Sequence, residues 1–356
     1  MRRTASVGLG RDWRKAAAIV LGALTFGAMV GCEPPTNAPA RPGYPPAYDP
    51  RPGYPGYPGY PGYQGYQGHP GYPPQPGYPP PPYAPTAPPM LAPLAGDASL
   101  REEVRYVVSE LVASLTPDQA AKIRGIPLKF DPDPSEINAF AGCEDGHAFL
   151  AVTQGLLDAV FAISQTQASD QLFGTRTYDA YMAAVVPPLV RTKGARATLP
   201  TGIVPPQVLA DPRVGSRARE LYGEVVAFTL GHELAHHYLG HTGCETGAVE
   251  SDFSPALLGH IATTIVPGLN QPNELASDTY GTANVLTAGR SRQARPAYRW
   301  TERGALTLFA FFTQLQQVGG SSSNLFLGFL RTHPNPQLRT PSVRAVAEDW
   351  RRRNPG

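Results

Sequence analysis

The segment GHELAHHYLGH at residues 231–241 holds four of the eight histidines in this 356-residue chain. His232, Glu233 and His236 follow the spacing His-Glu-x-x-His. On a helix the two histidines share one side, so both rings can reach one cation about 2 Å from each nitrogen. Glu233 lies roughly 100° further round the helix, where it can take a proton from a water molecule beside the metal. The spacing therefore predicts a zinc site with Glu233 as the catalytic base.

The other two histidines of the segment do not fit the same ion. On a continuous helix His241 lies about 180° from His232, which excludes it as a ligand. We expect His241 at the helix end or beside a ligand, and His237 on the exposed side. The third ligand must therefore come from elsewhere in the chain.

The segment NQPNELASDTYGTANVL, starting at residue 270, supplies that candidate. Glu274 and Asp278 share a helix face at i and i+4, where two carboxylates repel each other unless a cation lies nearby. Zinc bound by Glu274 provides the cation. Asp278 can then accept a hydrogen bond from the second nitrogen of a ligand histidine.

Two helices must position these groups. Asp211 and Pro212 form an N-cap and first-turn pair, and apolar residues then recur at steps of three and four up to the histidine segment. This pattern predicts a helix from residue 212 to residue 241 with His232 facing the core. A second helix is expected to begin near Pro272 or Asn273.

The N-terminus has the pattern of an export signal. Basic residues precede an apolar stretch, residues 16–30, that ends at Gly31 and Cys32. This arrangement resembles a bacterial lipoprotein signal, which implies a signal peptide at residues 1–31 and a lipid on Cys32. Glu33 after the cysteine resembles outer-membrane sorting, so we expect a lipid-anchored protein of the cell envelope that faces the periplasm. An ordinary signal peptide or an anchor helix with an incidental cysteine remains the alternative.

Residues 33–94 are compositionally distinct, with 23 prolines and 10 tyrosines in a recurring Pro-Gly-Tyr unit. Proline removes amide donors, and the segment lacks the aliphatic residues that a core requires. We expect residues 32–94 to form a disordered tether, with binding to an envelope component through the tyrosines as the alternative. The folded domain is then residues 95–356, where acidic and basic residues nearly balance and give no indication of nucleic-acid binding.

Only Cys143 and Cys244 remain once Cys32 carries the lipid. In an exported protein one disulfide between them is the economical prediction. Two separate buried thiols are the alternative.

Taken together, these motifs resemble the gluzincin metallopeptidase family of the CAAX prenyl protease and the heat-shock protease HtpX. The resemblance adds Asn138-Ala139-Phe140 as a strand, Gly155-Leu156-Leu157 as a helix start, and His333-Pro334 with Arg339 near the C-terminus. It covers most of residues 98–345. After the leader no run of 18 apolar residues appears, so the chain is similar to the periplasmic members of the family that lack transmembrane helices.

The resemblance implies an α+β fold: a mainly helical zincin-type domain with a small sheet beside the zinc helix. It also implies that His333 stabilises the oxyanion and that Arg339 supports the site. An edge strand beside the metal would align substrate as an added strand. That strand is expected to consist of His147, Ala148, Phe149, Leu150, Ala151, Val152 and Thr153.

Two features depart from the family pattern. Ser277 stands before Asp278 where the family usually has alanine. About 60 residues separate Leu157 from the zinc helix, and we expect this insertion, at about 164–218, to shape or cover the cleft.

The implied function is a zinc-dependent endopeptidase that acts on unfolded or misassembled envelope proteins. Zinc activates a water molecule and Glu233 transfers its proton to the leaving amine. Two alternatives stay open: a non-catalytic lipoprotein with a structural zinc and a binding tether, and a zinc hydrolase that acts on a non-peptide envelope substrate.

Overall fold

The computed structural model describes residues 89–244, 271–292, 298–319, 333 and 336–355. The signal segment, Cys32 and nearly all of the Pro-Gly-Tyr tether lie outside these residues. The described part is mainly helical with one small three-stranded sheet, which confirms the α+β prediction. Its elements are α1 (Gly96–Ala113), α2 (Pro117–Lys122), β1 (Leu128–Asp131), β2 (Ala139–Glu144), β3 (His147–Thr153), α3 (Gln154–Phe173), α4 (Thr177–Arg191), α5 (Pro206–Leu209), α6 (Pro212–Tyr238), α8 (Gln271–Ser291), α9 (Arg303–Gly319) and α12 (Pro336–Arg353).

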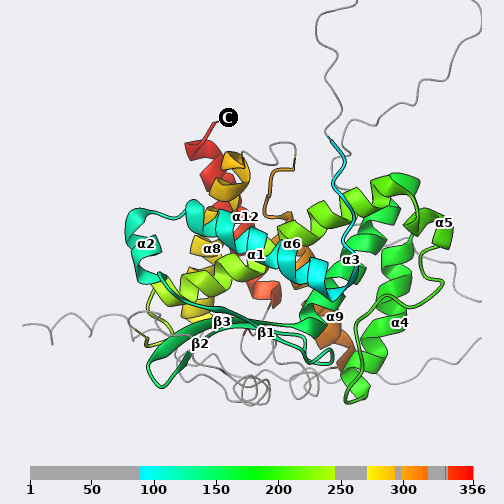
Figure 1. Cartoon of the computed structure of the whole chain (residues 1–356), viewed down its shortest axis with the longest axis horizontal. Coiled ribbons are helices and arrows are strands. Elements are labelled where there is room, and N and C mark those ends of the chain that lie inside the picture. Colours follow the sequence, from blue (N-terminus) through cyan, green and yellow to red (C-terminus); the bar gives the residue numbers. More distant parts are fainter. Residues whose placement is uncertain (1–88, 245–270, 293–297, 320–332, 334–335, 356) are drawn as a thin grey trace, which may run out of the picture. The chain divides into compact units, whose positions relative to one another are not determined.

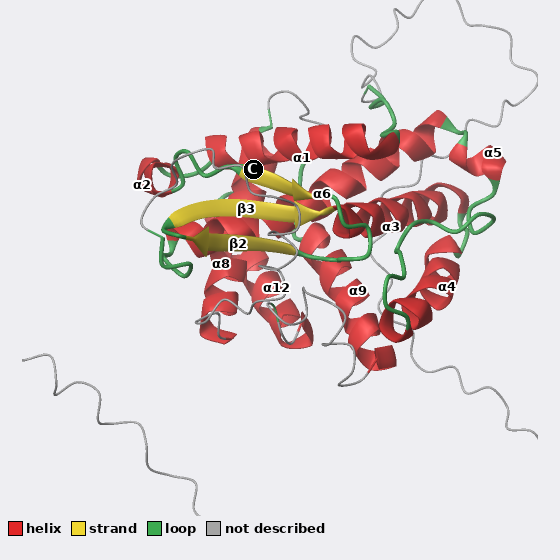
Figure 2. Cartoon of the chain, turned by 60° about the horizontal axis from the view of Figure 1, so that its bottom comes forward, coloured by secondary structure: helices red, strands yellow, loops and turns green. Residues whose placement is uncertain are grey.

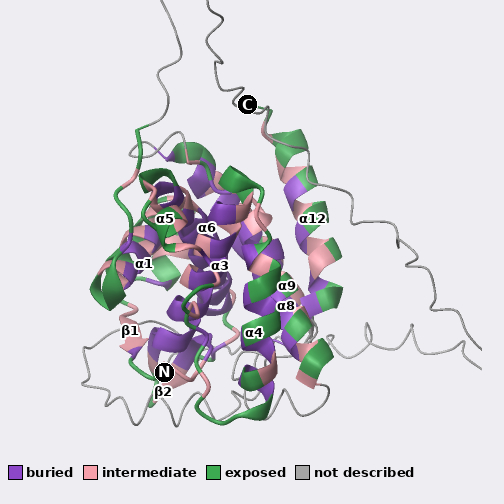
Figure 3. Ribbon diagram, turned by 90° about the vertical axis from the view of Figure 1, so that its right-hand side faces the viewer, coloured by how far each residue is buried: buried purple, intermediate pink, exposed green. Residues whose placement is uncertain are grey.

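Helix α6 is the centre of the described core (Figure 1). It begins as predicted, because the Asp211 side chain accepts a hydrogen bond from the backbone N–H of Arg213 and proline follows the cap. From Leu221 to Tyr238 every residue is buried. A helix that is buried on all sides must be enclosed by other elements, and α6 packs against α1, α3, α8 and α9 (Figure 3). The histidine segment therefore lies inside the protein.

The sheet has the order β1-β3-β2, with β1 parallel and β2 antiparallel to β3 (Figure 2). Strands β2 and β3 form a hairpin whose turn residues, Asp145 and Gly146, both have positive φ angles of 49° and 79°. Strand β3, residues His147–Thr153, is therefore central. The prediction that β3 is the edge strand was wrong. Strand β1, which precedes β2 in the chain, pairs with the side of β3 that β2 leaves open.

The predicted disulfide is present. Cys143 and Cys244 are bonded, with their Cα atoms 5.7 Å apart. The bond joins the end of β2 to the segment that follows α6. The alternative of two separate thiols is excluded.

Residues 89–94, which we call the N-terminal strap, lie on the folded domain although the sequence placed them in the tether. The backbone N–H of Leu91 donates to Ser216 Oγ at 2.9 Å. Arg219 donates to the carbonyl of Ala92 at 3.0 Å. Leu94 is buried in the main core. The folded domain thus begins before residue 95, and the strap is fastened to the first half of α6.

Deleting the strap should lower stability, whereas deleting only the residues before it should not. A chain that begins at residue 95 loses the burial of Leu94, worth about 1.5–3 kcal/mol, and two hydrogen bonds of about 0.5–1.5 kcal/mol each. We expect its free energy of unfolding, measured by urea titration, to fall by about 2.5–6 kcal/mol relative to a chain that begins at residue 89. Equal stability of the two truncations would show that the strap is not part of the domain.

The insertion forms the last part of α3, then α4, α5 and the first turns of α6. Helix α4 packs mainly on α3 and α9. Figures 1 and 2 show α4 and α5 at the end of the domain opposite α2. Whether this region controls access to the cleft stays a prediction. Among the described helices, none is both long enough and apolar enough to cross a membrane.

Candidate metal centre

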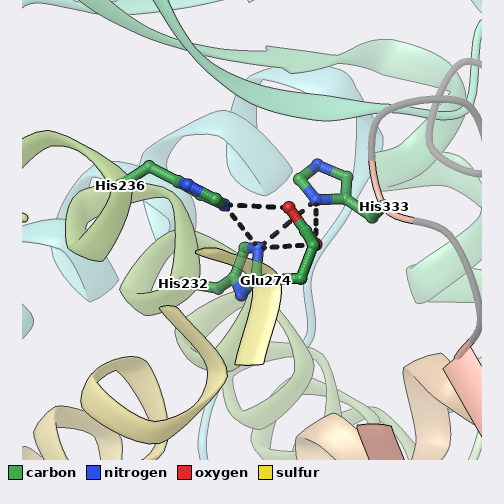
Figure 4. A group of neighbouring side chains, drawn as sticks. All are labelled: His232, His236, Glu274 and His333. Atoms are coloured by element: carbon green, nitrogen blue, oxygen red, sulfur yellow. Dashed lines mark hydrogen bonds and ion pairs between the residues drawn. The ribbon is translucent and has the colours of Figure 1, made fainter. Parts of the chain in front are cut away.

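Four buried side chains converge at one point beside α6 (Figure 4). His232 and His236 come from α6, Glu274 from the first turn of α8, and His333 from the residues before α12. Each offers one donor atom, and these atoms lie within 4.8 Å of one another. The group can hold a metal ion, as the sequence predicted for the first three residues.

The separations of the donor atoms suit a small tetrahedral ion. His232 Nε2 and His236 Nε2 are 3.0 Å apart. The Glu274 carboxylate is 3.3 Å from His236 Nε2 and 3.5 Å from His232 Nε2. His333 Nδ1 is 2.9 Å from the same carboxylate. Ligands about 2.0–2.1 Å from a tetrahedral zinc ion are roughly 3.3 Å apart, so the cluster needs little adjustment to receive one.

The electrostatic balance of the site also favours a dication. The carboxylates of Glu233, Glu274 and Asp278 are all buried, and Arg339 is the cation that pairs with two of them. Two negative charges therefore remain when all three carboxylates are ionised, and uncompensated buried charge is costly. Within the described residues, Glu274 Oε1 also has no hydrogen-bond partner. A divalent metal would balance this charge and bind Glu274 Oε1, whose neighbour at 3.3 Å is His236 Nε2.

In the absence of a metal, protons bound to the site neutralise part of this negative charge. Burial lowers the pKa of His232, but hydrogen bonds with Asp278 and Glu274 outweigh it and raise that pKa to about 9. Burial lowers the pKa of His236 to about 3, so this ring stays neutral. Burial opposes ionisation of Glu274, yet the neighbouring histidines hold its pKa below the ordinary value. Metal binding must therefore displace the proton of His232.

Asp278 and Arg339 orient the donors as the sequence proposed. Asp278 Oδ1 lies 3.0 Å from His232 Nδ1, so it accepts the proton of the nitrogen that faces away from the cluster. Arg339 donates to both oxygens of Asp278 at 2.6 and 2.7 Å. Its third nitrogen is 3.1 Å from Glu274. One buried guanidinium thus holds both carboxylates of α8 in place.

Close packing of α6 and α8 brings the donors together, and two glycines permit it. A Cβ atom on Gly281 would lie 2.8 Å from the backbone nitrogen of His232. A Cβ atom on Gly231 would lie 3.3 Å from the carbonyl oxygen of Gly281. Larger residues at Gly281 would push α8, and Glu274 with it, away from the histidines.

Glu233 stands between the cluster and the sheet. Its Oε2 accepts a hydrogen bond of 2.8 Å from the backbone N–H of Ala141 in β2. Its Oε1 is 3.3 Å from His333 Nε2. Burial raises the pKa of Glu233, although the neighbouring histidines oppose this. A carboxylate held beside a metal with a raised pKa is suited to accept and return a proton.

Among the described residues, β2 is the edge strand beside Glu233, and its residues 139–142 are buried. The backbone N–H of Thr153 donates to Asn138, and Phe140 pairs with Ala151, so residues 139, 141 and 143 direct their main-chain groups away from β3. The Ala139 carbonyl accordingly lies 3.3 Å from His333 Nε2. The edge strand beside the donor cluster is therefore Ala139–Glu144, and not residues 147–153 as predicted.

Comparison of the chain with protein-family models, curated proteins and solved structures found no match. The geometry of the cluster therefore carries the functional argument by itself.

His333 lies closer to the metal-binding atoms than the sequence suggested. Its Nδ1 is one of the four donors and its Nε2 faces Glu233. The resemblance gave His333 a role on the substrate oxygen but no contact with the ligands. It is also the one member of the four that no helix carries.

His237 differs from its predicted position, whereas His241 lies at the helix end beside His236, as expected. His237 is buried, and its Nε2 is 2.9 Å from the carbonyl of Phe149 in β3. Burial lowers the pKa of His237 to about 4, so the ring is a neutral donor that ties α6 to the sheet. The prediction of an exposed His237 was wrong because α6 is enclosed on every side. His241 lies beside His236, since the helix ends before it.

Proposed function

We propose that the chain is a zinc-dependent endopeptidase. The observation that carries this proposal is the position of Glu233, a buried carboxylate fixed between a cluster of metal donors and the edge strand β2. A structural metal site needs the donors alone. It does not need a carboxylate base beside them.

The chain's own residues then have distinct tasks. Zinc, when bound by His232, His236 and Glu274, would lower the pKa of a water molecule and polarise the scissile carbonyl. Glu233 takes the proton of the water at Oε1 and delivers it to the leaving amine. His333 would be the group that stabilises the substrate oxygen, and its Nδ1 would then leave the donor set, since three protein ligands hold a catalytic zinc.

The edge of β2 supports a peptide as the substrate. An extended chain would pair with β2 by displacing Glu233 from the Ala141 N–H and His333 from the Ala139 carbonyl, which would bring its own carbonyls alongside Glu233. Main-chain pairing places few demands on side chains. An extended segment without fixed structure is free to add to an edge in this way. We therefore propose unfolded or misassembled envelope proteins as the substrate class.

The cellular setting belongs to the same proposal. Lipid on Cys32 would hold the enzyme on the outer membrane facing the periplasm, with the Pro-Gly-Tyr tether between lipid and domain. The disulfide between Cys143 and Cys244 supports an oxidising compartment.

One observation favours a second candidate, a protein with a structural zinc and no turnover. With His333 included, the donors number four, and closed sets of four ligands are typical of structural zinc. The two candidates differ in whether the metal is needed for hydrolysis or only for stability.

Proteolysis of an unfolded protein separates them. The full chain should cleave casein, lose this activity when a chelator removes the metal, and regain it when zinc is returned. Intact casein after incubation with zinc-loaded, folded protein would favour the structural candidate. Cleavage that persists after complete removal of metal would contradict both.

A further inference from the structure

The chain turns at the C-terminal end of α6, and this turn brings the ring of His241 into contact with the ring of His236. The helix ends at Tyr238, and Gly240 has a φ of 79°, in the left-handed region. The N–H of His241 donates to the carbonyl of His236, and the N–H of Gly240 donates to that of His237, both at 2.9 Å. These two bonds define a Schellman motif, in which the residue after the glycine folds back onto the last full turn.

In most such motifs the folded-back contact joins two apolar side chains. Here it joins two imidazoles. His241 Nδ1 lies 3.0 Å from His236 Nδ1, and the ring planes are 66° apart. His236 directs its other nitrogen, Nε2, at the donor cluster. His241 therefore contacts the ligand on the side that faces away from the metal.

The tautomer of the His236 ring determines which nitrogen of the His241 ring carries its proton. A histidine that binds a metal through Nε2 must carry its proton on Nδ1. That N–H needs an acceptor, because a buried donor without one is costly. Within the described residues, His241 Nδ1 is the acceptor at hydrogen-bond distance, so it must be unprotonated and His241 must carry its proton on Nε2.

We propose that His241 is a positioning residue that holds His236 in the tautomer able to bind the metal. The inference rests on the metal site of the proposed function but not on peptidase activity. The buried hydroxyl of Ser277, on α8, is 3.3 Å from the same His241 nitrogen and limits movement of the ring.

Zinc affinity of the full chain, measured by competition with a chelator of known affinity, tests this role. His241→Leu removes the acceptor and should weaken zinc binding about 10- to 100-fold, as is usual when the partner of a ligand histidine is lost. His241→Gln retains an acceptor and should stay within a few-fold of wild type. The cobalt-substituted His241→Leu variant should also show altered visible absorption bands.

His237→Leu is the matched control, because His237 lies next to His236 and makes two buried hydrogen bonds, to the Phe149 carbonyl and the Thr242 hydroxyl, outside the donor cluster. It should lower the melting temperature and leave zinc affinity within about 3-fold. Wild-type affinity in His241→Leu would overturn the inference, as would equal losses in His241→Leu, His241→Gln and His237→Leu. A wild-type chain that binds no zinc would instead overturn the metal site itself.

Discussion

Glu233→Gln is expected to reduce casein hydrolysis by about 10²- to 10⁴-fold, the usual contribution of a general base. Glutamine keeps the shape of the side chain and still accepts the hydrogen bond from Ala141 N–H through its amide oxygen. It cannot accept the proton of a water molecule. The initial rate of casein cleavage at saturating zinc measures the effect.

Glu224→Gln is the matched control for this variant. Glu224 is a buried glutamate of the same helix that accepts hydrogen bonds from Thr301 and lies 3.2 Å from Arg303 Nε. Its loss should lower stability and leave turnover unchanged. Zinc content should be the same in Glu233→Gln as in wild type. Wild-type cleavage by Glu233→Gln would remove Glu233 from the reaction.

Arg339→Met is expected to cause the largest loss of stability, about 3–5 kcal/mol in metal-free protein. The guanidinium is fully buried and pairs with Asp278 and Glu274, so its removal leaves two buried carboxylates without their cation. Methionine fills much of the same volume and can still pack against Phe309, whose ring centre is 4.8 Å from the guanidinium. Urea unfolding in the presence of a chelator measures the change.

Zinc should recover part of this loss, because a dication supplies compensating charge to the same carboxylates. Arg351→Met is the control: its pair with Glu302 is half-exposed on the arginine side, and such pairs contribute about 0–1 kcal/mol. A loss below about 1 kcal/mol for Arg339→Met would show that Arg339 does not balance the charges of the centre.

Local patterns in the sequence were sufficient to predict the metal-binding elements. The cap at Asp211, the His-Glu-x-x-His spacing and the pair Glu274 and Asp278 all concern residues within one or two helical turns. Helix geometry alone fixes such relations. The predicted bond between Asp278 and a ligand histidine is present for the same reason.

Features that depend on distant segments were not predictable in this way. The order of the strands depends on where β1 is added, and no local pattern in β3 distinguishes a central from an edge strand when both faces are buried. The burial of His237 depends on β3 reaching α6. The strap was missed because its prolines resemble those of the tether, although Leu94 supplies an apolar contact.

One error had a readable signal. The predicted helix continues to His241, whereas α6 ends at Tyr238. Gly240 is a typical helix terminator, and a chain that leaves the helix there returns its next residue to the preceding turn. Reading the glycine as the helix end would have shown which histidine His241 contacts.

The metal content of the purified full chain tests the central claim most directly. After exposure to zinc and removal of excess, elemental analysis should find about one zinc ion per wild-type chain. His236→Ala and Glu274→Ala should each hold much less at the same free zinc concentration, while the control Glu224→Gln holds as much as wild type. Equal zinc content in all four proteins would contradict the assignment of the metal to this cluster.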